Sequence, residues 1–297
     1  MNIGVVVVLF NPEIDHINAL ISGFVDPHWH LVLVDNSPRS CEQKINGRVK
    51  YFHNDENVGI AEAQNIGLRY VFSQSIDYAF LLDQDSTFTP EIAMPLYKQF
   101  IDLESKVAIG ALGPSILCQF SESIEKGLVH KGEKISHDLK EVKQIISSGM
   151  LLSKDSFFNV GEKDSGLFID GVDHEWCWRA REKGFTIYQS TTTQMPHRQG
   201  DGRVNVLGIT FKLGAPIRLY YQFRNILILS RRGYVPLYWK CRHIAALPLR
   251  FIVNSIFFPQ NKVRGKFMCR GLWDGLLNRS GAISKSEKTK KLGNEEG

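Results

Sequence analysis

The chain contains a short apolar run that ends abruptly in polar residues, Tyr78-Ala79-Phe80-Leu81-Leu82-Asp83-Gln84-Asp85. Two similar runs come before it, at residues 5–10 before Asn11 and at residues 31–34 before Asp35. Short apolar runs that end in polar loops are typical of the buried strands of a parallel sheet. The carboxyl ends of such strands meet at one edge, where open α/β sheets bind their ligands. We therefore expect the polar residues after the three runs to share a site.

Helical patterns separate these runs, at residues 15–24 and 60–73. The alternation continues, with predicted strands at residues 107–117 and 145–152, the second interrupted by Ser148-Gly149, and a predicted helix at residues 172–183. A regular alternation of strands and helices is typical of α/β proteins, in which helices cover the faces of the sheet. The sequence therefore predicts an α/β fold.

The composition is that of a folded globular protein. The chain has 297 residues, of which 43% are hydrophobic and 23% are charged, and these values argue against a disordered, fibrous or polytopic membrane protein. Its five cysteines are dispersed and form no Cys-x-x-Cys pair, so we expect reduced thiols in a cytoplasmic protein. The amino terminus has no basic residue before its apolar run, and we interpret that run as a strand and not as a signal peptide.

The charge is divided unequally along the chain. Residues 218–297 hold 16 Lys and Arg against 4 Asp and Glu, whereas the rest of the chain holds 20 against 27. Residues 231–273 combine nine basic residues with many large apolar ones and have no acidic residue. This pattern predicts a basic amphipathic extension, residues 231–297, that lies on an anionic membrane and ends in a frayed tail, following a catalytic domain at residues 1–230. A helical hairpin packed on the body is the alternative, and the lack of a recognition motif argues against nucleic acid.

The acidic pair after the third strand suggests a metal site. Asp83 and Asp85 offer hard oxygen ligands, which suit Mg²⁺ or Mn²⁺ bound to the phosphates of a nucleotide. Two alternatives stay open at this point. One is a solvated turn, and the other is a haloacid-dehalogenase-type phosphatase, in which Asp83 would be the nucleophile.

Two further segments have the composition of a binding or catalytic site. Asn57 and Gly59 stand at the start of a predicted helix, where backbone amides can bind phosphate, although Asn57 can equally be a simple helix cap. Asp173 and Glu175 lie among aromatic residues, and such surroundings favour the raised proton affinity of a general base. Alternatively, the negative charges of both acids can simply stabilise the amino-terminal end of their helix through its dipole.

Taken in order, these motifs resemble the family 2 glycosyltransferases with a GT-A fold, and more closely their bacterial rhamnosyltransferase branch. The resemblance covers about residues 3–230. It rests on the pattern N-x-G-x-x-x-A-x-N-x-G at residues 57–67, D-x-D at residues 83–85, D-x-E-W-C-x-R-A at residues 173–180 and Y-Y-x-x-R-N at residues 220–225. It implies a Rossmann-like mixed sheet flanked by helices and a nucleotide-sugar substrate.

The resemblance also implies a role for individual residues. Asp83 and Asp85 hold Mg²⁺ or Mn²⁺, with His197 as a third ligand. The acid pair of the family falls on Val172-Asp173, so its first acid is missing; this makes Asp173 the expected base and Glu175 its competitor. The residues expected to bind the nucleotide sugar are Phe10, Asn11, Asp35, Asn57, Gly59, Asn65, Asp83, Gln84 and Arg224.

The expected function is an inverting, metal-dependent transfer of L-rhamnose from dTDP-L-rhamnose to a lipid-linked saccharide, in the synthesis of O-antigen or capsule. The protein would act as a peripheral protein on the inner face of the plasma membrane. Three alternatives remain: a transferase that uses another UDP- or dTDP-sugar, the phosphatase that uses Asp83, and a non-catalytic scaffold that binds nucleotide sugars.

Overall fold

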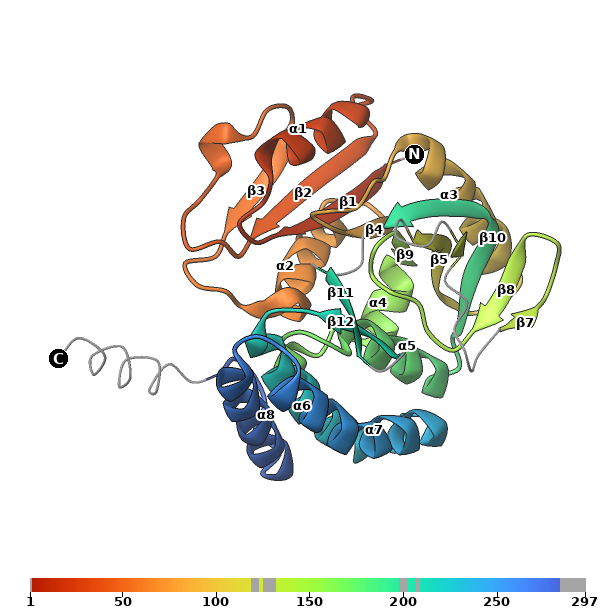
Figure 1. The fold of residues 1–297 in the computed structure, drawn as a ribbon. Helices are drawn as coiled ribbons and strands as arrows, with labels where there is room; N and C mark the ends of the chain where they lie inside the picture. Colours follow the sequence, from red (N-terminus) through yellow and green to blue (C-terminus); the bar gives the residue numbers. More distant parts are fainter. Residues whose placement is uncertain (1, 119–122, 125–131, 198–201, 207–208, 284–297) are drawn as a thin grey trace.

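A computed structural model of the chain describes residues 2–118, 123–124, 132–197, 202–206 and 209–283 (Figure 1). Its centre is a mixed sheet with the strand order β3-β2-β1-β4-β9-β5-β10-β8-β7, in which β6 pairs with β5. These strands are β1 (Ile3–Leu9), β2 (Trp29–Asp35), β3 (Val49–His53), β4 (Tyr78–Asp83), β5 (Ile109–Cys118), β6 (Ser123–Ile124), β7 (Glu133–Lys134), β8 (Leu139–Val142), β9 (Met150–Ser153) and β10 (Thr186–His197). A separate hairpin joins β11 (Gly202–Val206) to β12 (Ile209–Leu213).

The three predicted strands lie side by side and run in parallel. β1 pairs with β2 on one side and with β4 on the other, with Leu9 opposite Asp35 and Val8 opposite Asp83. The loops after the three strands therefore leave the sheet at one edge, as the sequence predicts. β9 then enters between β4 and β5 and is antiparallel to both.

Helices cover both faces of this sheet. They are α1 (Ile14–Gly23), α2 (Gly59–Ser73), α3 (Pro90–Glu104), α4 (Lys154–Val160) and α5 (Val172–Glu182), with short 3₁₀ turns at Glu42–Lys44 and Ser165–Leu167. Val5 and Val7 of β1 pack with α1 and α3, whereas Val6 and Val8 pack with α2, α4 and α5. Side chains alternate between the two faces of a strand, so a run of four valines supplies both cores.

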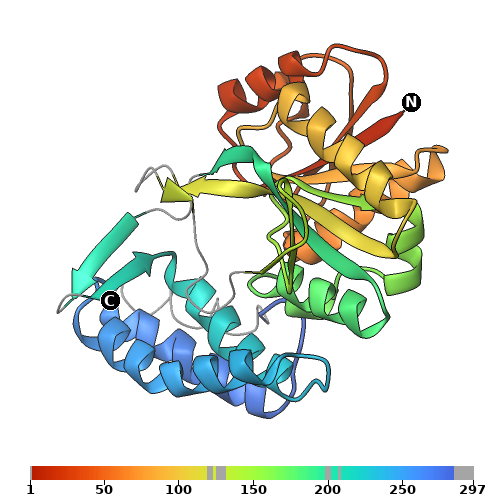
Figure 2. The ribbon, with the colours of Figure 1, turned by 90° about the vertical axis from the view of Figure 1, so that its right-hand side faces the viewer.

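The carboxyl-terminal part forms three helices, α6 (Pro216–Ser230), α7 (Leu237–Ile256) and α8 (Asn261–Leu276). Figure 2 shows them together below the sheet. Phe223 of α6, Trp239 of α7 and Met268 of α8 share one hydrophobic cluster, which also includes Trp178 of α5. The Tyr220 hydroxyl donates a hydrogen bond to Asp274 at 2.9 Å. The helices that follow residue 230 therefore pack against α5 and α6, and membrane association of this segment stays a prediction.

Several details differ from the sequence-based expectation. β3 was not predicted, because its five residues, VKYFH, form neither a continuous apolar run nor a regular alternation of polar and apolar side chains. The strand expected at residues 145–152 begins only at Met150, after a turn at Ser147. The frayed tail expected at residues 284–297 lies outside the described residues. Among the described residues, no helix is both long enough and apolar enough to cross a membrane.

Candidate active site

The predicted metal ligands lie in a tight turn at the end of β4. Asp83 is the last residue of the strand and is half-buried, and Asp85 is exposed. The Ser86 amide donates to the Asp83 carbonyl at 3.0 Å, and the Asp83 amide donates to Ser86 Oγ at 3.2 Å. These two hydrogen bonds fix the turn, so that Asp85 projects from the edge of the sheet while its neighbours are held in place.

The ends of β1 and β4 are tied together by Gln84. Its Oε1 accepts a hydrogen bond from the Phe10 amide at 2.6 Å, and its Nε2 donates to the Phe10 carbonyl at 3.2 Å. Phe10 is 46% exposed. Asn11 follows with a φ of 48°, a left-handed conformation that asparagine tolerates better than most residues, and its amide donates to Ser37 Oγ at 2.7 Å. Phe10, Asn11 and Gln84 therefore come together, as expected.

Asp35 is fully buried below this edge. Its Oδ1 accepts from the Ser37 amide at 2.8 Å, and its Oδ2 accepts from the Tyr51 hydroxyl and the Cys41 thiol. Burial alone would raise the pKa of Asp35, but these hydrogen bonds outweigh it and leave the pKa below its usual value. In this structure Asp35 orders the loop after β2 and exposes no surface to a base or ribose.

Asp173 lies in the first turn of α5 and faces the turn before β9. Its Oδ2 accepts from the Ser147 amide at 3.1 Å and from Ser147 Oγ at 3.2 Å. Its Oδ1 is buried and has no hydrogen-bond partner among the described residues. Ser148, which follows Ser147 in the chain, donates a hydrogen bond from its hydroxyl to Asp83 Oδ2. Two adjacent serines therefore connect the predicted base to the predicted metal ligand.

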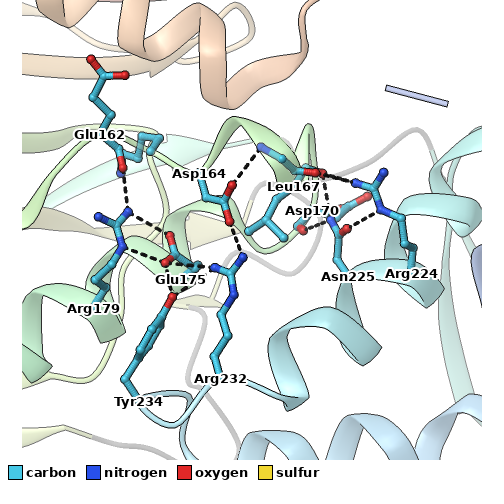
Figure 3. A network of polar contacts seen from close by, with 12 residues as sticks. Glu162, Asp164, Leu167, Asp170, Glu175, Arg179, Arg224, Asn225, Arg232 and Tyr234 are labelled. Carbon is cyan, nitrogen blue, oxygen red and sulfur yellow. Dashed lines mark hydrogen bonds and ion pairs between the residues drawn. The ribbon is translucent and has the colours of Figure 1, made fainter. Parts of the chain in front are cut away.

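Glu175 is buried among charged and phenolic partners, which argues against its prediction as a competing base. It is 1% exposed and accepts hydrogen bonds from Arg179 Nε at 2.8 Å and from the Tyr234 hydroxyl at 2.6 Å (Figure 3). Arg232 lies 3.2 Å away and also pairs with Asp164. Burial and the bond to Glu175 raise the pKa of Tyr234 to about 12, so this hydroxyl remains a donor at neutral pH. With two guanidinium groups and a phenol around it, Glu175 has no access to an acceptor.

Arg224 is also placed differently from the prediction. It is fully buried, and its guanidinium donates to the backbone carbonyls of Gly166 at 3.0 Å, Leu167 at 2.9 Å and Gly281. Its neighbour Asn225 donates to the carbonyls of Leu167, Ile169 and Asp170 (Figure 3). Arg224 therefore holds the loop before α5 and has no free face for a diphosphate in this structure.

The motif at residues 57–67 mainly fixes the same loop. The Asn65 side chain donates to the Lys163 carbonyl at 2.9 Å and accepts from the Lys163 amide at 2.8 Å, and it is fully buried. Gly59 has a φ of +84°, and a Cβ there would lie 2.6 Å from the Phe168 carbonyl oxygen. Asn57 is exposed, and its Oδ1 accepts from the Gly59 amide at 2.9 Å. Asn65 and Gly59 are thus packing residues, while Asn57 remains at the surface.

Comparison with known proteins identifies the family. The model of the family described as Glycosyl transferase family 2 matches residues 5–158. The chain is also 32% identical over 256 residues to the dTDP-rhamnosyl transferase RfbF of Shigella flexneri, a match that covers 82% of this chain and 84% of that protein. The chain belongs to glycosyl transferase family 2. This membership removes the phosphatase alternative.

Two more distant matches were also found, one in sequence and one in fold. The chain is 21% identical over 246 residues to the low-salt glycan biosynthesis hexosyltransferase Agl10 of Haloferax volcanii, which covers 77% of this chain and 75% of that protein. Its fold is similar to the crystal structure of GalNAc-T7 with UDP, GalNAc and Mn²⁺, with a TM-score of 0.56 and 14% identity. That match covers 93% of this chain and 56% of the other one. The predicted GT-A-type fold is confirmed.

The donor set of this glycosyltransferase fits a divalent metal that is shared with a substrate. Asp83 and Asp85 supply carboxylate oxygens, which Mg²⁺ and Mn²⁺ prefer. Within the described part of the chain, no group of three or more His, Cys, Asp and Glu residues is arranged to hold a metal. His197 ends β10, and its side chain lies outside the described part. Two carboxylates suit an ion whose other positions are filled by phosphate oxygens and water.

Two residues near Asp173 were not singled out from the sequence, namely Ser147 and Lys163. The sequence does contain a signal for the turn at Ser147: two serines stand before Gly149, and an apolar run follows. Small polar residues next to a glycine indicate a tight turn. Lys163 is 2% exposed, and its Nζ lies 4.6 Å from the centre of the Trp176 ring and 3.4 Å from Met150 Sδ. Burial lowers the pKa of Lys163, and the nearby Asp173 opposes this shift. No sequence motif marks this lysine.

Proposed function

We propose that the protein transfers L-rhamnose from dTDP-L-rhamnose to a saccharide acceptor with inversion at the anomeric carbon. The observation that carries the proposal is the pairing of Ser147 with Asp173 and of Ser148 with Asp83, which gathers a base and a metal-binding carboxylate at one edge of the sheet. The similarity to a dTDP-rhamnosyl transferase over most of both chains supports the choice of donor.

Asp173 is the base in this proposal. Its Oδ2 is held by Ser147, and its Oδ1 is buried without a hydrogen-bond partner among the described residues. A buried oxygen without a hydrogen-bond partner is unfavourable, and the hydroxyl of the acceptor sugar would supply the missing hydrogen bond when substrate binding brings it to Oδ1. As the hydroxyl oxygen bonds to the anomeric carbon, its proton passes to Oδ1. The bond from that carbon to the diphosphate breaks on the opposite face, which inverts the configuration.

Asp83 and Asp85 would hold Mg²⁺ or Mn²⁺ on the donor diphosphate. A bound divalent ion stabilises the negative charge of a leaving diphosphate as a Lewis acid. Gln84 keeps the ends of β1 and β4 together, so that Phe10, Asn11 and the acidic turn face the same nucleotide. Asn57 is exposed near the start of α2 and is the remaining candidate for a donor contact.

A donor panel tests this proposal. The purified protein would be incubated with dTDP-L-rhamnose, UDP-galactose, UDP-glucose or GDP-mannose, with Mg²⁺ or Mn²⁺, and release of nucleoside diphosphate would be measured. We expect turnover with dTDP-L-rhamnose, and its loss in the Asp173→Asn variant. Turnover of only a UDP- or GDP-sugar would overturn the donor assignment, and a protein that binds a donor without turnover would be a scaffold.

We also propose that the carboxyl-terminal helices rest on the anionic inner face of the plasma membrane, where a lipid-linked acceptor would be found. Five large apolar side chains of α7 are exposed. Leu249, Ile252 and Ile256 follow helical spacing, and Leu237 and Ile244 lie two turns apart on the first half of the helix. Exposed basic residues lie on α7 and α8, namely Arg242, Lys262 and Lys266. An apolar stripe beside basic side chains is the pattern of helices that lie in the plane of an anionic membrane.

The charges for the docking test have to be chosen from the structure. Arg264 is 5% exposed and donates to the carbonyls of Pro259 and Gly214, so its replacement would disturb the packing of α8. The test variant therefore changes only Arg242, Lys262 and Lys266 to Glu. A matched control changes three exposed basic residues outside these helices to Glu, namely Lys44, Arg48 and Lys98.

Co-sedimentation with phosphatidylglycerol vesicles gives the readout. We expect the wild type and the control to bind at low salt, and the test variant to lose binding, because each basic residue near an anionic surface contributes about 1 kcal/mol. High salt should weaken binding by the wild type. Equal binding to neutral and anionic vesicles, or unchanged binding by the test variant, would contradict electrostatic docking.

A further inference from the structure

The turn before β9 holds two carboxylates of the site through adjacent side chains. Ser147 and Ser148 are 2% and 1% exposed. Ser147 donates both its amide and its hydroxyl to Asp173 Oδ2, and Ser148 donates its hydroxyl to Asp83 Oδ2. Among the described residues, Ser147 provides all the hydrogen bonds that the Asp173 carboxylate accepts. The two serines therefore act on carboxylates that are 90 residues apart in the sequence and come from different elements.

This turn is itself fixed to the sheet. The Met150 amide donates to the Ser147 carbonyl at 2.9 Å, which closes a four-residue turn. Gly149 is its third residue and has a φ of +81°, the conformation that a type II turn requires at this position. The Gly149 amide donates to the Leu81 carbonyl of β4 at 2.9 Å, and a Cβ on Gly149 would lie 2.8 Å from Pro114 Cγ of β5. The serine pair is thus anchored between two strands.

Such an anchor has a chemical consequence. Consecutive Cα atoms are about 3.8 Å apart, so neighbouring serines on a rigid turn hold their partners at a fixed separation. A transfer with inversion needs the base on one side of the anomeric carbon and the charge-stabilising carboxylates near the leaving group on the other. A displacement of about 1 Å between such groups is enough to slow a reaction by about a hundredfold.

We propose that Ser147 and Ser148 are positioning residues with separate tasks. Ser147 fixes Asp173 so that Oδ1 faces the acceptor hydroxyl, and Ser148 fixes the Asp83 carboxylate in the orientation that binds the metal. This inference rests on the proposed function, since it assumes that Asp173 is the base and Asp83 a metal ligand. It predicts that replacement of Ser147 and replacement of Ser148 have different consequences.

Four variants separate these tasks: Ser147→Ala, Ser147→Thr, Ser148→Ala and Ser148→Thr. For each one, Mn²⁺ binding in the presence of dTDP would be measured by electron paramagnetic resonance, and kcat and donor KM would be measured with dTDP-L-rhamnose. Ser147→Ala should lower kcat about tenfold and leave Mn²⁺ affinity and donor KM unchanged. Ser148→Ala should weaken Mn²⁺ binding about tenfold or more, as is usual when a residue that orients a metal ligand is lost. Each Thr variant keeps the hydroxyl and should restore most of the affected property.

Three outcomes would overturn the proposal. The first is that both Ala variants lose kcat and Mn²⁺ affinity together, in proportion to a fall in melting temperature, as a merely structural role would produce. The second is that neither variant differs from the wild type. The third is that Thr and Ala variants are equally impaired. A wild type that does not turn over dTDP-L-rhamnose would instead refute the donor assignment, and in that case Mn²⁺ binding by the Ser148 variants, which needs no turnover, still decides the proposal.

Discussion

The Gln84 side chain forms two hydrogen bonds with the backbone of Phe10, accepting from its amide at 2.6 Å and donating to its carbonyl at 3.2 Å. These residues follow β4 and β1, two parallel neighbours in the sheet. Backbone amide and carbonyl groups just past the end of a strand have no hydrogen-bond partner in the neighbouring strand. Here the Gln84 side chain, which follows the neighbouring strand β4, forms those bonds with Phe10. The middle residue of the D-x-D motif therefore joins the turn at residues 83–86 to the loop after β1, which is expected to meet the nucleotide.

Replacing Gln84 with Met should loosen this connection. Met is similar in size but cannot form either hydrogen bond, so donor KM should rise about fivefold or more, while kcat changes much less. Each lost bond costs about 1 kcal/mol of stability, so the melting temperature should fall only slightly. Steady-state kinetics with a varied donor concentration is the measurement. An unchanged KM would show that the two loops are positioned independently of Gln84.

Replacing Asp85 with Ala should abolish metal-dependent turnover without unfolding the protein. Asp85 is exposed in a turn that other residues hold, so its side chain contributes little to packing. Asp102→Ala is a matched control, because Asp102 is exposed on α3 and its carboxylate forms a surface ion pair with Lys106. Donor turnover would be assayed after EDTA treatment and addition of Mn²⁺. Wild-type activity in Asp85→Ala would refute the metal role.

The two acids of α5 should respond in opposite ways to loss of charge. Asp173→Asn should lower kcat by about 10²–10⁴, the usual contribution of a general base, with a nearly unchanged melting temperature and donor KM. Glu175→Gln leaves Arg179 and Arg232 short of a buried partner and should cost about 3 kcal/mol of stability. Calorimetry and kinetics on both variants provide the test. A stable but inactive Glu175→Gln protein, beside an active Asp173→Asn protein, would reverse the assignment.

The packing of α7 should give a pH dependence of stability. His243 stacks on Trp239 with ring centres 4.1 Å apart, and burial, together with Arg250, Arg242 and His174 nearby, lowers its pKa from 6.5 to about 4. Between these values the unfolded chain binds the proton and the folded protein does not, so stability falls as the pH decreases from 6.5 towards 4. His243→Phe keeps the stacking and removes this contribution.

The melting temperature of the wild type should therefore fall more steeply over that range than that of His243→Phe. Carboxylates with lowered pKa values, such as Asp35, contribute the same slope to both proteins, so the difference between the curves isolates the histidine. Parallel curves would show that His243 is exposed to solvent and that α7 is not packed as described.

The strand ends could be predicted from the sequence because one local signal, an apolar run followed by polar residues, fixes both the element and its edge. The contact between Ser148 and Asp83 could not, because it depends on the antiparallel entry of β9 beside β4, with Leu81 opposite Met150. That pairing joins segments almost 70 residues apart, and no local sequence pattern in either segment indicates it.

Motif residues were predicted by position but not by orientation. Glu175, Arg224 and Asn65 all belong to the family patterns, yet each one is buried. Arg224 and Asn65 are bonded to the loop between α4 and α5, and Glu175 is bonded to Arg179, which donates to the Glu162 carbonyl of that loop. A polar residue in a motif can touch a ligand or hold the backbone that does so, and only the packing distinguishes the two. A count of charges in the carboxyl-terminal segment likewise does not distinguish exposed from buried residues. Arg264 is part of that count, but it is buried.

The central claim is that Asp173, together with the acidic turn of β4, transfers rhamnose to a lipid-linked saccharide. Its most direct test is to incubate radiolabelled dTDP-L-rhamnose, Mn²⁺ and bacterial membranes carrying the acceptor with the wild type, Asp173→Asn or Asp85→Ala, and to count the label in the organic extract. We predict label in the extract with the wild type only. Equal label with the Asp173→Asn protein, or none with the wild type while another nucleotide sugar is transferred, would contradict the account.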